Sequence, residues 1–279
     1  MEFIKTIIEF FKNKDGVAIM KDLFNIMFFI VTGCIAVLTY LKARVSVLQP
    51  IKTEVFKQQL IVFSEIMEIF NGKDEAQIRE FFAFKKIEQV NTVKLIDEYI
   101  EHFFEVKFNR EERPYNRKEC KISMVTQKTV EKYFTLDNEP VREEIAASSN
   151  EETNRPNPAI KAAIWQKYEF GIISIPNEFI QAEEKIDRIK QSPLLPKACV
   201  KYLSDIQEIA HKNITILRET LEKIAQELPE KYPNKQILLK ISTTWISNKY
   251  NDEFISFEGK VNELLDYLRD YLKVDNLLE

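Results

Sequence analysis

Histidine and carboxylate side chains are the groups in this chain best suited to acid–base or metal chemistry. Glu98 lies four residues before His102, so in a helix the two side chains share one face. Such a pair could relay a proton or bind a metal ion, but neither an H-E-x-x-H motif nor a third ligand accompanies it. We therefore expect a helical ion pair here. The second histidine, His211, stands alone.

The motifs of nucleotide-dependent and nucleophilic enzymes are missing from the sequence. Its five glycines are isolated, which excludes Gly-rich phosphate loops, and no G-x-S-x-G elbow is present. The three cysteines, Cys34, Cys120 and Cys199, have no metal-ligand spacing and suggest no disulfide framework, which favours a reducing compartment. We expect no catalytic residue, no metal site and no cofactor, and predict that the protein is not an enzyme.

The charged loop at residues 109–121 is the best candidate for contact with a ligand. Arginine forks bind phosphate groups, and a tyrosine ring can stack on a base. The loop could therefore contact a nucleotide, a nucleic-acid strand or anionic lipid headgroups, while its glutamates favour a solvated loop as the alternative. The candidate contacts are Arg110, Arg113, Tyr115, Arg117, Lys118 and Lys121.

An uncharged run of nineteen residues, 23–41, lies between Asp22 and Lys42. As a helix it would be about 28 Å long, close to the ~30 Å thickness of the hydrocarbon core of a bilayer. The sequence therefore predicts a transmembrane helix over residues 22–46, with membrane lipid as its first partner. No Ala-x-Ala cleavage pattern follows the run, so we expect a retained anchor.

The polar residues of this span fall on one stripe of the helix. Asn25, Thr32 and Thr39 are seven residues apart, with Phe29 and Ala36 between them. Small and polar side chains promote helix association in lipid, so the stripe predicts an interface of a homo-oligomer. A pore lining with Phe29 as a hydrophobic gate is the second interpretation, and an incidental arrangement is the third.

Helical periodicity dominates the remaining sequence. Residues 1–21 predict an amphipathic segment lying in the membrane interface, or alternatively packed on the protein itself. Residues 47–136 predict a helical region, 137–158 a polar, proline-bearing linker or mobile loop, and 159–279 a helical domain. The predicted fold is mainly α: an amphipathic helix, one transmembrane helix and a helical-bundle cytoplasmic body with at most minor β-structure.

Finer features of the soluble part are also predicted. Residues 75–89 and 92–108 should form two helices, and residues 171–176 a short strand, whereas residues 122–136 fit a strand and a helix equally. The longest helix should span residues 196–228, stopped by Pro229. Two more helices are expected over residues 235–249 and 256–272.

Charge restricts the partners and the orientation of the protein. The formal net charge of −4 argues against a general nucleic-acid binder. Lys and Arg are balanced on the two sides of the span, although Lys42 and Arg44 follow it directly. Together with the cysteine usage, this places the C-terminal body in the cytoplasm and the span in the inner, cytoplasmic membrane.

The layout of an N-terminal membrane helix followed by a cytoplasmic helical domain resembles that of single-pass transmembrane effector proteins of bacterial anti-phage defence systems. The resemblance implies that a ligand or an operon partner protein shifts the oligomer and that the membrane is then permeabilised. The alternatives are a non-conducting scaffold or tether that binds a partner protein, and a signal relay.

Overall fold

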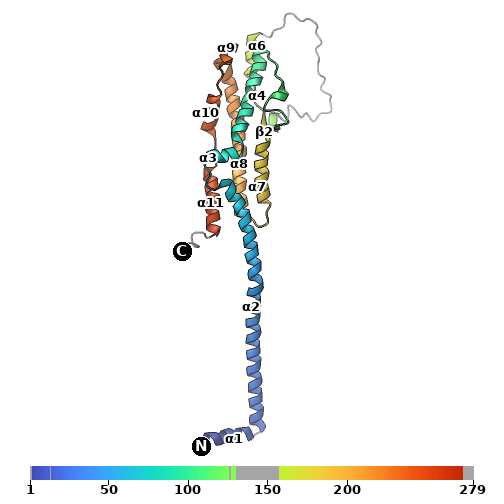
Figure 1. Cartoon of the computed structure of the whole chain (residues 1–279), viewed down its shortest axis with the longest axis vertical. Coiled ribbons are helices and arrows are strands. Elements are labelled where there is room, and N and C mark those ends of the chain that lie inside the picture. Colours follow the sequence, from blue (N-terminus) through green and yellow to red (C-terminus); the bar gives the residue numbers. More distant parts are fainter. Residues whose placement is uncertain (1, 13, 126, 130–156, 273–279) are drawn as a thin grey trace, which may run out of the picture. The chain divides into compact units, whose positions relative to one another are not determined.

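The structure is a computed structural model that describes residues 2–12, 14–125, 127–129 and 157–272. It is mainly helical, with one two-stranded sheet among the described residues (Figure 1). The chain divides into two compact units, residues 1–61 and residues 62–279, the second of which we call the body. The prediction of a mainly helical chain with one long apolar N-terminal helix is confirmed.

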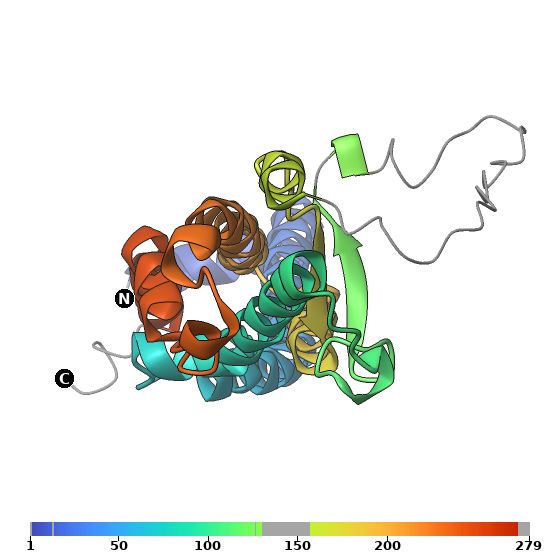
Figure 2. The same ribbon diagram turned by 90° about the horizontal axis from the view of Figure 1, so that it is seen from above.

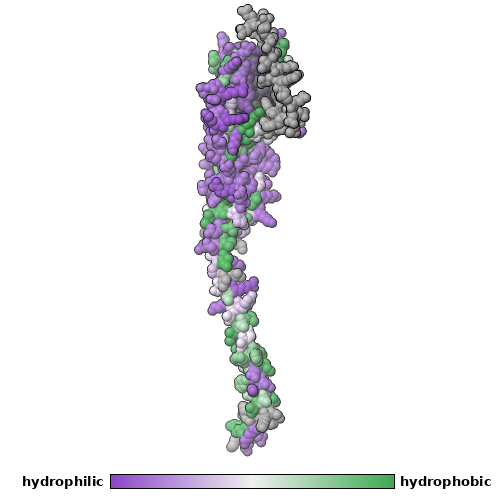
Figure 3. Space-filling model, turned by 90° about the vertical axis from the view of Figure 1, so that its right-hand side faces the viewer, coloured by the Kyte–Doolittle hydropathy of each residue, from purple (hydrophilic) through white to green (hydrophobic). Residues whose placement is uncertain are grey.

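The first unit contains α1 (Glu2–Lys12) and most of α2 (Lys14–Phe70). Phe3, Ile4 and Ile8 of α1 are exposed. Within the described residues, α2 supplies the one helix long and apolar enough to cross a membrane, and its apolar stretch is not buried by the chain. Figure 3 shows this apolar surface in green. The helix continues through the predicted boundary after residue 46 and through Pro50.

A turn at Asn71 and Gly72 ends α2. Two helices follow, as predicted, but they are divided at a different position. In α3 (Glu75–Phe81) Asp74 accepts a hydrogen bond from the backbone of Gln77, whose side chain accepts one from the backbone of Asp74. This capping box fixes the start of the helix. The next helix, α4 (Phe84–Phe104), begins after Ala83, whose φ of 54° is left-handed. The predicted break between residues 89 and 92 was therefore wrong.

The small sheet pairs β1 (Cys120–Met124) with β2 (Ile172–Pro176) in antiparallel register. The strand predicted for residues 171–176 is confirmed, and the ambiguous stretch begins as a strand. On the other side of β2, the side chain of Asn91 donates to the Ser174 carbonyl and accepts from the Ser174 N–H, both at 2.8 Å. An amide on α4 thus satisfies the outward-facing backbone groups of β2 as a third strand would.

The helices that follow are α6 (Pro158–Trp165), α7 (Asn177–Lys190) and α8 (Lys197–Lys231). The periodic apolar residues of α8 are buried as predicted, but the helix continues through Pro229. Proline has no N–H to bond the carbonyl four residues earlier, at Ala225. That carbonyl instead accepts a hydrogen bond from the indole N–H of Trp165, at 2.8 Å. The free carbonyl is therefore satisfied, and the helix keeps one more turn.

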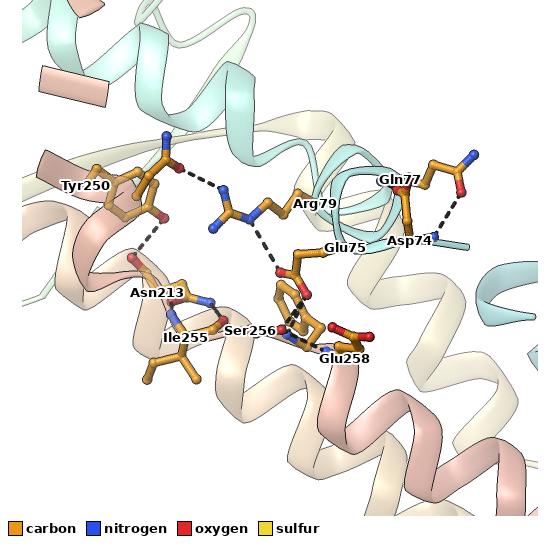
Figure 4. Close-up of polar contacts among 11 residues, drawn as sticks. Asp74, Glu75, Gln77, Arg79, Asn213, Tyr250, Ile255, Ser256 and Glu258 are labelled. Atoms are coloured by element: carbon orange, nitrogen blue, oxygen red, sulfur yellow. Dashed lines mark hydrogen bonds and ion pairs between the residues drawn. The ribbon is translucent and has the colours of Figure 1, made fainter. Parts of the chain in front are cut away.

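The chain ends with α9 (Lys235–Leu238), α10 (Thr244–Glu253) and α11 (Glu258–Leu272), so the helix predicted over residues 235–249 is interrupted. Glu75 of α3 joins these elements (Figure 4): it accepts hydrogen bonds from Ser256 and from the backbone of Phe257, and it pairs with Arg79 at 3.4 Å. A carboxylate from α3 thereby supplies hydrogen-bond acceptors just before the start of α11, where the helix dipole favours negative charge.

Helix α8 is at the centre of the body core, with the small sheet at one side of the packed helices (Figure 2). Beside it lies an aromatic cluster around Phe82, which is fully buried and stacks on Phe257 with ring centroids 5.2 Å apart. The ring of Phe82 also contacts Phe84 and Phe179. These side chains come from the turn after α3, from α4, from α7 and from the segment before α11, so the cluster joins elements far apart in sequence.

Candidate functional site

The charged loop contains one 3₁₀ turn, η1 (Arg110–Glu112), and its basic side chains contact acidic groups of α4. Arg113 pairs with Asp97 at 2.9 Å, and the hydroxyl of Tyr115 donates to the same carboxylate at 3.0 Å. Asp97 is buried, and burial raises the pKa of its carboxyl, while Tyr115 and Arg113 oppose that shift. Arg113 and Tyr115 thus anchor the loop to α4.

The other basic residues of the loop differ in their surroundings. Arg110 pairs with Glu101 at 3.1 Å. Arg117 and Lys118 are exposed, and Lys121 lies on β1 at the edge of a small groove. The six predicted contacts therefore do not converge on one point, and two of them have a structural partner in Asp97.

The predicted stripe of the span lies on the exposed surface of α2. Asn25, Phe29, Thr32, Ala36 and Thr39 are all exposed within the single chain, and Phe29 retains 72% of its accessible surface. A polar stripe on an apolar helix therefore remains available for contact with lipid or with other copies.

The predicted ion pair between Glu98 and His102 is wrong. The ring Nε2 of His102 lies 2.8 Å from the carbonyl oxygen of Lys161, whereas Glu98 accepts a hydrogen bond from the hydroxyl of Tyr168. Both partners belong to the segment around α6, which packs beside α4. A tertiary contact thus replaces the local one.

Glu98, His102 and Tyr168 line a cleft with a volume of about 1120 Å³. Its walls come from α4, α6 and the residues leading into β2. Trp165 and Tyr168, stacked with ring centroids 4.3 Å apart, form one side of it. The charged residues that line the cleft are Lys94, Glu98, Glu101, Arg110, Lys128, Lys167 and Glu169.

Most of these charges are paired. Lys128 pairs with Glu169 at 2.9 Å, and Arg110 pairs with Glu101 as described above. Lys94 is half-buried, donates to the Ile172 carbonyl at 2.8 Å and lies 5.2 Å from the centroid of the Phe170 ring. Burial is the main reason why the pKa of Lys94 is lowered. The cleft therefore combines an aromatic wall with a desolvated cation.

Of the charged residues that line this cleft, only Arg110 was predicted from the sequence to contact a ligand. Of the aromatic residues that line the cleft, Trp165 and Phe170 are buried and Tyr168 is partly buried. The signal that could have drawn attention to the cleft was the spacing of Lys94, Glu98 and Glu101, which places three charges on one face of α4.

No group of three metal-ligating side chains is found within the described residues. No protein-family model, curated protein or solved structure matches the chain. The apolar helix surface of α2 and the cleft in the body are therefore the two features from which a function can be inferred.

The floor of the cleft also supports a test of packing. A Cβ atom at Gly171 would lie 2.1 Å from Oγ1 and 3.2 Å from Cβ of Thr129. We expect Gly171→Ala to lower the free energy of unfolding by about 1–3 kcal/mol through overpacking. In urea unfolding, Gly171→Ala combined with Thr129→Ala should lose less than the two single variants added together. Additive losses would contradict the predicted clash.

Proposed function

We propose that this protein is a single-pass, homo-oligomeric membrane effector of bacterial defence. Its cytoplasmic helical body senses a ligand or partner, and its transmembrane helices permeabilise the membrane. The observation that carries the proposal is the apolar stretch of α2, which the chain leaves unburied. An apolar helix surface of this length requires lipid or other helices around it. Lipid and further copies of the chain are its partners.

The stripe on the span supports self-association. A polar side chain facing hydrocarbon is costly, whereas the same side chain can hydrogen-bond across a helix interface. The side chains of Asn25, Thr32 and Thr39 avoid this unfavourable exposure to hydrocarbon when the stripes of several copies face one another. A ring of such helices would place Phe29 at a narrow apolar point, which gates by excluding water.

The location in the inner membrane, with the body in the cytoplasm, is part of the proposal. Cys120 and Cys199 are buried free thiols, and burial raises the pKa of Cys199 to about 11. Such thiols serve as core residues in a reducing compartment. Lys42 and Arg44, directly after the apolar run, agree with the positive-inside rule.

The alternative is a non-conducting tether that holds the body at the membrane to bind a partner protein. It is favoured by the cleft in the body, because such a binding feature can serve a partner without any conduction through the span.

Ion flux from liposomes distinguishes the two functions. We expect the full-length protein to release a trapped ion, and replacing Asn25, Thr32 and Thr39 together by leucine to abolish the release, because the polar lining is removed. The matched control replaces Met27, Ile30 and Val37 by leucine, which changes three apolar residues outside the stripe. Equal flux from the stripe variant and the wild type would contradict the pore. No flux from the wild type would favour the tether.

A further inference from the structure

Lys94 differs in its partner from two other cations that line the cleft. Arg110 pairs with the carboxylate of Glu101, and Lys128 pairs with that of Glu169. Among the described residues, the hydrogen-bond partner of Lys94 is a backbone carbonyl, that of Ile172. Within the part of the chain that the structure describes, this half-buried ammonium thus lines the cleft without a carboxylate at ion-pair distance.

This environment favours an incoming anion. An ammonium group has three N–H donors, and the Ile172 carbonyl accepts one of them. Burial of a charge without a counter-ion is costly, which agrees with the lowered pKa of Lys94, to which Arg110 also contributes while Glu98 opposes it. A bound anion would add to the counter-charge of Glu98 and accept the remaining hydrogen bonds.

An aromatic and apolar surface lies in the same cleft. Trp165 and Tyr168 stack at an interplanar angle of 18°. Ile160 and Ile164 of α6 also line the cleft and remain more than half exposed, at 54% and 56%. Planar rings of ligands pack on such surfaces by stacking and burial of apolar area.

We propose that the cleft binds a small phosphorylated ligand with a planar ring, of which a nucleotide is the representative chemistry. The phosphate binds at Lys94, and the ring packs against Tyr168 and the exposed Ile160 and Ile164 of α6, with the buried Trp165 supporting Tyr168 from behind. Glu98 and Glu101 accept hydrogen bonds from hydroxyl or amine groups of the ligand. A cleft of about 1120 Å³ has room for such a molecule.

This inference rests on the ligand-sensing part of the proposed function and names its ligand class and site. It moves the expected nucleotide from the loop at residues 109–121 to the cleft, with Arg110 common to both. Binding in the cleft does not require conduction by the span, so failure of either proposal leaves the other standing.

Fluorescence of Trp165 in the full-length protein in mild detergent tests the site. The chain has two tryptophans, so Trp245→Phe leaves Trp165, in the wall of the cleft, as the sole reporter. ATP and GTP are the probes, and inorganic triphosphate and adenosine represent the two halves of the ligand. We expect a saturable change of emission with a nucleotide and weaker responses to either half.

Lysine variants on one helix supply the control. Lys94→Met should weaken nucleotide binding by about tenfold or more, because a charge-assisted hydrogen bond is lost. Lys94→Arg, which retains the charge, should bind more tightly than Lys94→Met. Lys86→Met removes a cation of α4 that pairs with Glu178 outside the cleft, and should leave binding unchanged.

Three results would overturn the proposal. One is an absence of saturable change with either nucleotide at millimolar concentration. Another is an equal loss of affinity in Lys94→Met and Lys86→Met. The third is binding of inorganic triphosphate as tight as that of ATP, which would remove the ring from the site. Circular dichroism of each variant verifies the fold, and Lys94→Arg provides the comparison if Lys94→Met is unfolded.

Discussion

Replacing Phe82 by alanine is expected to lower the free energy of unfolding of the body by about 3–5 kcal/mol. The ring is fully buried and contacts aromatic side chains from α4, α7 and the segment before α11. Its loss leaves a cavity that three separately anchored elements cannot fill by moving together. Urea unfolding of the full-length protein in detergent measures the effect, because both tryptophans lie in the body and report on it alone.

A matched truncation at the surface controls for the loss of apolar atoms. Leu239→Ala removes a side chain that is 87% exposed, and it should change the free energy of unfolding by no more than about 0.5 kcal/mol. Phe82→Leu should lie between the wild type and Phe82→Ala. A loss for Phe82→Ala as small as that for Leu239→Ala would show that the aromatic cluster does not stabilise the body.

Replacing Asn91 by leucine should have the second large effect, a loss of about 2–5 kcal/mol, because two buried backbone groups of Ser174 lose their partner. Leucine has a similar volume, so the hydrogen bonds and not the packing are tested. The same urea titration measures the change.

The control and a conservative variant sharpen this prediction. Asn248→Leu alters an exposed asparagine of α10 and should have little effect. Asn91→Asp keeps an acceptor for the Ser174 N–H but places a buried carboxylate against the carbonyls of Ser174 and Ile87, so a loss at least as large as that of Asn91→Leu is expected at neutral pH. If Asn91→Leu were as stable as the wild type, the side-chain amide would not be what holds β2 to α4.

Periodicity predicted the apolar helix of the N-terminal unit and the long buried helix of the body, because each depends on side chains within one element. It failed where a tertiary partner changed the local outcome. Residues 75–108 carry apolar positions at helical spacing throughout, so nothing in that pattern marks the left-handed residue Ala83 that separates α3 from α4. Likewise, part of the cost of Pro229 within a helix is the carbonyl that it leaves without a donor, and Trp165 supplies that donor from a distant segment.

The candidate site was harder to predict than the fold. Local sequence shows that residues 109–121 are basic, but not that Asp97 holds Arg113 and Tyr115. The cleft is built from α4, α6 and the start of β2, and their approach depends on contacts such as that between Asn91 and Ser174. A sequence pattern shows which face of a helix is charged, whereas the facing element decides whether that charge becomes a site.

The side chains that bond to the outer edge of β2 also affect the solubility of the protein. A two-stranded sheet has two outer edges, and an open edge can template pairing with another chain. Asn91 and Lys94 occupy backbone acceptors along the edge of β2, at Ser174 and Ile172, so an incoming strand would have to displace both side chains. Variants that lose either residue should therefore be more prone to aggregate through strand addition, even where their folded state persists.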